Sequence, residues 1–447
     1  MKQQLLIKNA TIVNEGKAFS SDIFIENGII NTIAPNIRKV VSDTIDAAGL
    51  YLFPGIIDPH VHFREPGLTY KADIHTESAA AIAGGVTSYM DMPNTIPNAT
   101  NKTELAKKYE LAANTSFANF GFYFGATSDN LDEITSLDAN ECCAVTDDGL
   151  YFTNKESLLV EQPDVLRKIL RVSPKLVAIH SELESVVNDN LEKAIAKYGD
   201  NMPVHMHAHI RSEDACYKAT KLATEIAGES GNHLHILHVS TAKELDLFES
   251  YKDITKKKIT SEVCIHHLYF SEEDYDHLGA RIKWNPSVKS YADKIGLLDG
   301  LRNYQVDIVS TDHAPHLLSE KEQHYTKSPG GGPMIQHSLV AMLEFVKTEK
   351  LSLERIAEVM CHNVAELYKI DGRGYIREGY YADITLVDLD EKWQVQKSNI
   401  LSKCGWSAFE GRYFSSKIKY TIVNGNIAYK DGRIISEPCG VRLRHKL

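Results

Sequence analysis

The residues of this sequence that could do chemistry are histidines and carboxylates placed directly after short apolar runs. His60 and His62 stand two residues apart after the run GIID. Residues two apart on a strand point to the same face, so both imidazoles can bind one metal ion. Imidazoles and carboxylates without thiolates are typical ligands of Zn²⁺, Mn²⁺ and related divalent ions. Further candidates of these two types follow other apolar runs: Asp148, His180, His238 and Asp312.

The elements that must position these side chains are strands separated by helical segments. Eight short apolar runs recur between residues 55 and 311, with helical spacing in the gaps. This alternation is typical of βα units, and eight parallel strands predict a closed (β/α)8 barrel, an α/β fold. The active site of such a barrel lies at the carboxyl ends of its strands, where these histidines and carboxylates stand. The runs cover residues 55–58, 86–92, 120–126, 142–145, 176–179, 234–239, 259–265 and 307–311.

The two ends of the chain show a different pattern from the middle. Residues 1–54 and the residues after 375 contain short apolar runs separated by Asn-Gly and Asp-Gly turns, which predict hairpins. Each piece is too small to bury a core well alone, so we expect the two to pair into one discontinuous β-sandwich domain. The predicted division is a small β domain from 1–54 and 375–447, and a metal-dependent (β/α)8 barrel from 55–374.

Composition and charge exclude several classes of function. The 447 residues carry 49 Lys and Arg against 60 Asp and Glu, a net charge of −11, with no basic stripe for a phosphate backbone. No window holds 18 consecutive apolar residues, so no membrane span is expected. The seven cysteines form no CxxC pair, which fits a reducing cytoplasm. We therefore expect a cytoplasmic protein that acts on a small molecule and binds neither nucleic acid nor membrane.

Several stretches of the sequence resemble the amidohydrolase superfamily and, within it, the dihydroorotases. The HxH pattern is shared across the superfamily, whereas HFREPG, DMPNT and TDHAPH together are far more specific. The resemblance extends over nearly the whole chain. Its stretches are PGIIDPHVHFREPG (54–67), GGVTSYMDMPNT (84–95), AVTDDG (144–149), VAIHSE (177–182), HLHILHVST (233–241), IKWNP (282–286) and STDHAPH (310–316).

The resemblance implies zinc as the cofactor, with one or two ions per subunit. His60 and His62 would bind the more buried ion. His180 and His238 would bind the second ion. Asp312 would contact the first ion and serve as the catalytic base.

Members of this family divide at the fourth strand of the barrel. Many carry a carboxylated Lys there as the bridging ligand, whereas another branch uses the second Asp of a TDDG motif. This sequence has Thr146, Asp147 and Asp148 at that place and no Lys nearby. We therefore expect Asp148 to be the bridging ligand and keep Asp147 as the alternative.

The implied reaction is the reversible cyclisation of N-carbamoyl-L-aspartate to L-dihydroorotate and water in pyrimidine biosynthesis. A divalent metal lowers the pKa of water that it binds, and Asp312 would move the proton between water and the ring nitrogen. The substrate carries a further carboxylate, for which Arg64 offers a planar bidentate partner. The resemblance adds Asn94 and His316 as carboxylate contacts and Asn285 as a contact to the ring. It also implies a homo-oligomer, expected to be a dimer.

Two other classes of function compete with this interpretation. Another cyclic amidohydrolase, such as a hydantoinase, dihydropyrimidinase or allantoinase, is similar at HxH but usually carries the fourth-strand Lys and lacks an Arg in the place of Arg64. A catalytically inactive scaffold resembling dihydroorotase commonly loses HxH or the last Asp, and both are present here. The dihydroorotase interpretation is therefore favoured.

A polar segment follows the last predicted strand of the barrel. Residues 316–332 read HLLSEKEQHYTKSPGGG and end in three glycines. Such a segment could close over the active site, and a simple exposed loop is the alternative.

Overall fold

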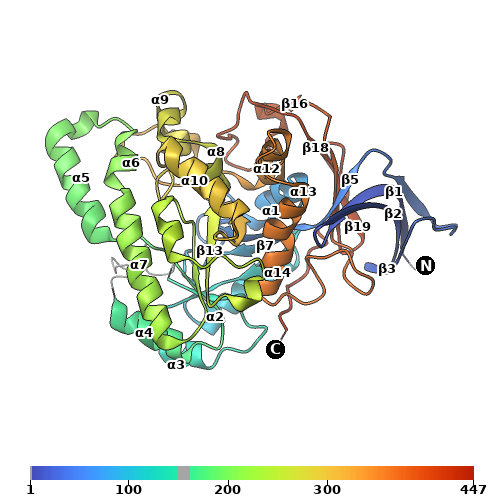
Figure 1. Ribbon diagram of the computed structural model, residues 1–447, viewed down its shortest axis with the longest axis horizontal. Coiled ribbons are helices and arrows are strands. Elements are labelled where there is room, and N and C mark those ends of the chain that lie inside the picture. Colours follow the sequence, from blue (N-terminus) through green and yellow to red (C-terminus); the bar gives the residue numbers. More distant parts are fainter. Residues whose placement is uncertain (1–2, 148–161, 447) are drawn as a thin grey trace.

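The computed structural model describes residues 3–147 and 162–446. The chain forms a (β/α)8 barrel with a small β domain attached at one side, and this confirms the predicted fold class. Figure 1 shows the blue strands β1 and β2 from the start of the chain beside β18 and β19 from its end. The green helices α5 and α7 lie at the opposite end of the molecule.

Each barrel strand overlaps one of the apolar runs, although the fourth strand shares only Val145 with the run 142–145. Neighbouring strands pair in parallel, and the third barrel position is made of two short pieces, one pairing with each neighbour. A parallel bridge between Val61 and His313 joins the first and last strands, and the His62 amide donates a hydrogen bond to His313 O at 2.8 Å. The strands are β6 (Ile56–Val61), β7 (Val86–Asp91), β8 (Asn119–Phe122), β9 (Phe124–Gly125), β10 (Val145–Thr146), β11 (Val177–Ile179), β12 (Leu234–Ile236), β13 (Ile259–Cys264) and β14 (Ile308–Ser310).

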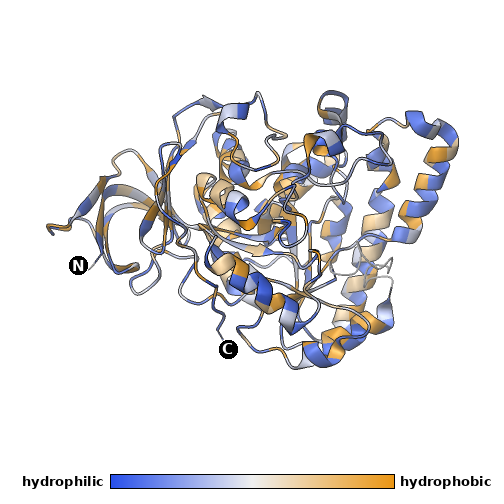
Figure 2. Cartoon of the chain, turned by 180° about the vertical axis from the view of Figure 1, so that it is seen from behind, coloured by the Kyte–Doolittle hydropathy of each residue, from blue (hydrophilic) through white to orange (hydrophobic). Residues whose placement is uncertain are grey.

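Helices cover the outside of the barrel, and Figure 2 shows hydrophilic and hydrophobic residues on different sides of the long ones. Such amphipathic helices bury their apolar side against the sheet. They are α1 (Ile74–Ala83), α2 (Lys102–Ala113), α3 (Leu131–Thr135), α4 (Pro163–Val172), α5 (Glu184–Tyr198), α6 (Met206–Ile210), α7 (Glu213–Ser230), α8 (Ile265–Tyr269), α9 (Tyr275–Leu278), α10 (Tyr291–Arg302), α11 (Leu318–Lys321), α12 (Ser338–Lys347), α13 (Leu353–Ala357) and α14 (Asn363–Leu367). Among the described residues, no helix is both long and apolar enough to cross a membrane.

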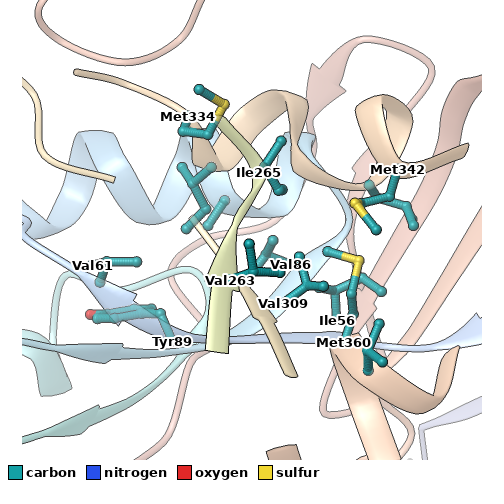
Figure 3. Close-up of a cluster of buried hydrophobic side chains, with 14 of the residues drawn as sticks. Ile56, Val61, Val86, Tyr89, Val263, Ile265, Val309, Met334, Met342 and Met360 are labelled. Atoms are coloured by element: carbon teal, nitrogen blue, oxygen red, sulfur yellow. The ribbon is translucent and has the colours of Figure 1, made fainter. Parts of the chain in front are cut away.

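The core of the barrel lies between the strands and the surrounding helices. In Figure 3, Val263 and Val309 from neighbouring strands pack with Ile56, and Met342 of α12 lies close to them. Each of these side chains is almost completely buried. Burial of one such side chain contributes roughly 1.5–3 kcal/mol. Because this packing fixes the strands, it also fixes the residues that leave their carboxyl ends.

The small β domain is one nine-stranded sheet built from both ends of the chain. Strand β5 from the first segment pairs antiparallel with β15 from the second, and this pairing joins the two segments. The Asn-Gly turns at Gly28 and Gly425 touch each other, and a Cβ on Gly28 would lie 2.7 Å from Asn424 O. The strands are β1 (Gln4–Asn14), β2 (Lys17–Glu26), β3 (Ile29–Ala34), β4 (Asp43–Asp46), β5 (Tyr51–Pro54), β15 (Ile384–Asp388), β18 (Lys417–Val423), β19 (Asn426–Lys430) and β20 (Arg433–Ile434).

Parts of the last 70 or so residues lie against the barrel rather than in this sheet. A separate antiparallel pair is formed by β16 (Trp393–Gln394) and β17 (Tyr413–Phe414). Trp406 lies in the connection between these two strands, and its Nε1 donates a hydrogen bond to His316 O at 2.8 Å. Near the C-terminus, Arg442 forms a parallel bridge with Phe120 of β8. The division at residue 375 therefore stays a prediction, since 375–447 includes segments in contact with the barrel.

Candidate active site

His60 lies at the carboxyl end of β6 and is held by a buried carboxylate. Its Nδ1 lies 2.6 Å from Oε1 of Glu262 on β13, and the other Glu262 oxygen lies 3.4 Å from His235 Nε2. Burial alone would raise the pKa of the Glu262 carboxyl, but the two imidazoles hold it below its ordinary value. A carboxylate at Nδ1 fixes the ring and leaves Nε2 to face the site.

Asp312, two residues beyond the end of β14, lies beside both histidines of the HxH pair. Its Oδ1 is 3.0 Å from His62 Nε2 and 3.6 Å from His60 Nε2. The other nitrogen of His62 lies 3.0 Å from Asn94 Oδ1. One candidate ligand atom from each of His60, His62 and Asp312 lies within 4.8 Å of the other two. This is the spacing that one shared ion needs.

His180 and His238, from the ends of β11 and β12, face the same place. Their ring centroids are 4.9 Å apart, and the His238 ring is 5.4 Å from that of His60. Burial, followed by the neighbouring imidazoles of His180 and His60, lowers the pKa of His238 well below its ordinary value. His238 is thus held neutral, which is the state in which an imidazole binds a metal.

The fourth-strand prediction is only partly within the described residues. Asp147 is buried, and its Oδ1 accepts a hydrogen bond from the His180 amide at 3.0 Å and lies 2.8 Å from His180 Nδ1. Asp148, the expected bridging ligand, lies outside the residues that the structure describes. Asp147 therefore orients His180, and the choice of bridging ligand between the two stays a prediction.

The unpartnered atoms of this cluster fit a divalent metal. Within the described ranges, His60 Nε2 and both nitrogens of His238 are buried without a hydrogen-bond partner, as is Asp147 Oδ2. Buried polar atoms without partners are costly and need an explanation such as a missing ion. A set of imidazoles and carboxylates suits divalent ions such as Zn²⁺. The described residues therefore fit a metal, without showing which one.

The backbone at the strand ends aims these side chains into the mouth of the barrel. Arg64, His238 and Asp312 all have positive φ, at 68°, 38° and 45°. This conformation is strained for residues other than glycine and persists where the surroundings hold it. The amide of Phe63, the residue before Arg64, donates a hydrogen bond to Asp91 Oδ1 at 2.7 Å. Asp91 in turn forms a buried ion pair with Lys108.

A cavity of about 380 Å³ opens in front of the cluster. Pockets of a few hundred Å³ are the usual size for small ligands. His62, His180, His238 and Asp312 line it on the metal side. The predicted substrate contacts also line it: Arg64, Asn94, Asn285 and His316.

Arg64, Lys71 and His316 line one part of the cavity, called the basic end from here on. Arg64 Nε donates to Pro315 O at 3.1 Å, and its Nη2 donates to His316 Nε2 at 3.1 Å. Burial lowers the pKa of His316 well below its ordinary value, and the charges of Arg64 and Lys71 lower it further. A neutral histidine and a guanidinium at one end suit an anionic group of a ligand.

Segment 316–332 lines the cavity with its two ends, while residues 319, 322–324 and 326–327 are exposed. Pro329, Gly330 and Gly331 line the cavity, and a Cβ on Gly330 would lie 2.8 Å from the Asn285 side chain. Lys321 is buried, and its Nζ donates to carbonyl oxygens of Pro329 at 2.8 Å and Gly331 at 2.7 Å. The expected closing motion of this segment stays a prediction.

Comparison with known proteins identifies the family of the chain. Residues 51–428 match the Amidohydrolase family. The chain belongs to this family. It is 32% identical over 445 residues to the dihydroorotase of Methanosarcina mazei, covering 97% of this chain and 95% of that protein. It is 30% identical over 450 residues to the allantoinase of Desulfitobacterium hafniense, covering 98% of both.

The solved structures of the family include close matches to this amidohydrolase. The L-hydantoinase (dihydropyrimidinase) from Arthrobacter aurescens superposes with a TM-score of 0.91 over 100% of both chains, at 25% sequence identity. The family membership and the predicted resemblance are thus confirmed. Relatives named for three different ring substrates leave the particular activity open.

Sequence reasoning missed some polar residues that line or support the site of this amidohydrolase. Glu262 lies inside β13. An acidic residue within an otherwise uncharged parallel strand could have indicated a buried charge with a partner, and hence a functional residue. Glu182 and Arg211 form a partly buried ion pair at the cavity, and Lys71 lines its basic end. Nothing in their spacing identifies Arg211 or Lys71, because they reach the cavity from separate loops.

A second group with metal-like composition lies next to the site. Cys264, His266 and His267 place candidate atoms within 4.8 Å of one another. However, the Cys264 sulfur contacts Ser310 Oγ at 3.2 Å, and burial raises the pKa of the Cys264 thiol. The Cys264 sulfur thus has a hydroxyl partner already, and we assign no ion to this group.

Proposed function

We propose that this amidohydrolase is a dihydroorotase that interconverts N-carbamoyl-L-aspartate with L-dihydroorotate and water. The observation that carries the proposal is that Arg64 and Asp312 line the same small cavity. The cavity therefore offers a cation that can bind a carboxylate together with a carboxylate that can carry a proton in amide chemistry. The relatives named dihydroorotase, at 32% identity over nearly the full length, support the same choice.

The residues that would hold the metal are those at the carboxyl ends of the barrel strands. His60, His62 and Asp312 would hold one ion, and His180 and His238 a second, with zinc as the proposed metal. When bound, a divalent ion supplies Lewis acidity: it polarises a carbonyl oxygen and makes water a stronger nucleophile at neutral pH.

Asp312 is the proposed proton carrier. In ring opening, water adds to a ring carbonyl carbon, and the bond between that carbon and the ring nitrogen breaks. Asp312 takes the proton that water loses and gives it to the departing nitrogen, and ring closure reverses these transfers. Asp312 has two oxygens, of which Oδ1 lies 3.0 Å from His62 Nε2, so the second can face the substrate.

The carboxylate of the substrate would bind at the basic end. Arg64 supplies a planar guanidinium there, and His316 lies beside it. Asn94 Oδ1 accepts a hydrogen bond from His62 Nδ1 at 3.0 Å. The N–H groups of the Asn94 amide are therefore the ones that would donate to the substrate carboxylate. Asn285, which also lines the cavity, would contact the ring.

A second candidate function is another cyclic amidohydrolase activity. It is supported by the relatives named allantoinase, at 30% identity, and by the similarity to the L-hydantoinase structure, with a TM-score of 0.91. An inactive scaffold is less well supported, because His60, His62 and Asp312 are all present and close together. The proposed homodimer and the cytoplasmic location stay predictions from sequence.

The test is a comparison of substrates with one purified preparation. We expect turnover of L-dihydroorotate to exceed that of hydantoin, dihydrouracil and allantoin, with divalent metal found by elemental analysis. Preferred turnover of allantoin or hydantoin would replace the proposal with the second candidate. Metal content without turnover of any ring would favour the scaffold.

A further inference from the structure

Lys321, the last residue of α11, is only 1% exposed, and its amino group bonds to backbone oxygens. Its Nζ donates hydrogen bonds to Pro329 O at 2.8 Å, Gly331 O at 2.7 Å and Lys283 O at 3.0 Å. These three bonds use all three N–H groups of an ammonium. Burial lowers the pKa of Lys321, and the charge of Lys283 lowers it further. The hydrogen bonds to the three carbonyl oxygens oppose this cost of burying the cation.

The three oxygens belong to two segments that meet at the cavity. Pro329 and Gly331 come from the segment after β14, and both line the cavity. Lys283 stands two residues before Asn285, which lines the cavity as well. The Gly331 amide also donates a hydrogen bond to Lys283 O, at 2.8 Å. Lys321 therefore joins the two segments at the place where each of them reaches the cavity.

Between the two carbonyl groups of its own segment that Lys321 holds, Gly330 lies against the side chain of Asn285. A Cβ on Gly330 would lie 2.8 Å from Asn285 Cγ and 2.9 Å from each of Asn285 Nδ2 and Oδ1. Gly330 thus covers the amide group of Asn285 and leaves no room for a larger residue. Asn285 Oδ1 is buried and has no hydrogen-bond partner among the described residues. Packing against Gly330, rather than a hydrogen bond to that oxygen, therefore limits how this amide turns.

We propose that Lys321 is a positioning residue: by holding the carbonyl groups on both sides of Gly330, it keeps Gly330 against Asn285 and so fixes the direction of the Asn285 amide in the cavity. This rests on the proposed contact between Asn285 and the substrate ring, and extends it to the residues that hold Asn285. Lys321 is not among the described residues that line the cavity, so it acts through the backbone rather than by touching the ligand. An amide that is fixed before the ligand arrives loses less freedom on binding.

Lys283 strengthens the same connection from the other segment. Its Nζ donates hydrogen bonds to Tyr325 O at 2.9 Å and to Ser328 O, and both of these residues belong to the segment that carries Gly330. Each lysine thus donates to the segment of the other. A change at Lys321 leaves the segment attached through Lys283, so it should move Gly330 locally rather than release the whole segment.

The experiment measures kcat, KM and metal content of the metal-loaded enzyme, with the ring that wild type turns over best. Lys321→Met keeps an unbranched apolar side chain but removes the three donors. It should raise KM about 10- to 100-fold and change kcat by less than about threefold, because Asn285 serves binding while Asp312 and the metal ligands stay in place. Metal content should equal that of wild type. Lys321→Gln, which keeps two N–H donors, should raise KM less, and it replaces Lys321→Met if that variant does not fold.

Gly330→Ala tests the same mechanism without changing a lysine. Gly330 has no positive φ, so an alanine is free of backbone strain there, and its Cβ would push the amide of Asn285 out of place. We expect an increase in KM of the same size as for Lys321→Met. In an Asn285→Ala background, both changes should alter KM by less than about threefold, because the group through which they act is gone.

The matched control is Lys257→Met. Lys257 is also 1% exposed, and its Nζ donates hydrogen bonds to Tyr304 O at 2.7 Å and to Asp307 Oδ1 at 2.6 Å. It stands before the amino end of β13, whereas the cavity lies at the carboxyl ends of the strands. Lys257→Met should lower the temperature of thermal unfolding and leave KM unchanged. It therefore measures what the loss of a buried lysine does by itself.

The outcomes separate this inference from the proposed function. If no ring is turned over, or if Asn285→Ala leaves KM unchanged, the proposed contact with the ring fails, and the role of Lys321 fails with it. If Asn285→Ala raises KM while Lys321→Met or Gly330→Ala leaves it unchanged, the contact stands and the positioning role is overturned. Equal increases of KM in Lys321→Met and Lys257→Met would overturn it in favour of a general loss of stability. Effects of Lys321→Met that add fully to those of Asn285→Ala would also overturn it.

Discussion

The carboxylate of Glu262 lies 2.6 Å from Nδ1 of His60, and both side chains are completely buried. The contact keeps the hydrogen of the ring on Nδ1, so Nε2 presents a lone pair to the site. His235 supports the same carboxylate from behind, with its Nε2 at 3.4 Å. A metal ligand of this kind is oriented before any ion arrives, which lowers the cost of binding one.

Replacing Glu262 tests whether this orientation matters. Glu262→Leu should weaken metal binding about 10- to 100-fold, the usual effect of losing such a supporting group. Glu262→Gln should have a smaller effect, because its amide oxygen still accepts the hydrogen bond from Nδ1. Competition with a chelator measures the affinity, and thermal unfolding of the metal-free variants controls for folding. Equal affinities in wild type and Glu262→Leu would mean that His60 is held in place by packing alone.

The sequence predicted the barrel well because its signal is local. Each strand is a short apolar run, and the residue after it points to the mouth of the barrel, so His60, His180 and Asp312 could be placed from spacing. Contacts that cross the sequence could not be placed in that way. Glu262 meets His60 across 202 residues, and Lys71 meets His316 across 245 residues. Such pairs depend on how separate loops fold over the mouth, which no periodicity encodes.

A histidine of the cluster should be dispensable for folding but not for metal. His238→Ala is expected to lose bound metal and activity together while keeping the far-ultraviolet circular dichroism of the wild type, because His238 lies at the mouth and makes no hydrogen bond through its ring within the described residues. His60→Ala should behave in the same way. His209→Ala, an exposed histidine on α6, is the control and should keep both properties. Full activity in a metal-stripped His60→Ala protein would refute the metal assignment.

Asp312 should separate metal binding from proton transfer. Asp312→Asn is expected to keep most of the metal, since the neighbouring imidazoles of His60 and His62 remain. It should lose about 10²- to 10⁴-fold in kcat, because an amide cannot carry the proton. Elemental analysis and steady-state kinetics on the same sample measure the two effects. Turnover close to that of the wild type would show that another group is the base.

The fourth strand offers a choice between neighbouring carboxylates. We expect Asp148→Ala to reduce bound metal more than Asp147→Ala does, because the TDDG resemblance makes Asp148 the ligand. Asp147→Ala should still weaken binding about tenfold or more, since Asp147 contacts Nδ1 of His180 at 2.8 Å and orients that ring. Metal titration of the two variants decides between them. The opposite order, or a carboxylated Lys found by mass spectrometry of the native protein, would assign the bridging position to another residue.

Substrate choice depends on Arg64, whose guanidinium lies at the basic end of the cavity beside His316. Arg64→Lys should already be damaging, because an ammonium cannot reproduce the bidentate fork of a guanidinium. Loss of a buried charge-assisted pair costs about 2–5 kcal/mol, which corresponds to about 30-fold to several thousandfold in kcat/KM.

The loss in Arg64 variants should appear only with substrates that carry the carboxylate. The measurement is kcat/KM for dihydroorotate and dihydrouracil with wild type and Arg64→Ala, at one pH and one metal concentration. Wild type should prefer dihydroorotate, and Arg64→Ala should lose most of that preference while its rate on dihydrouracil changes little. An Arg64→Ala enzyme that still prefers dihydroorotate would place carboxylate recognition elsewhere in the cavity. It would also remove the main physical reason for choosing dihydroorotase over the other cyclic amidohydrolases.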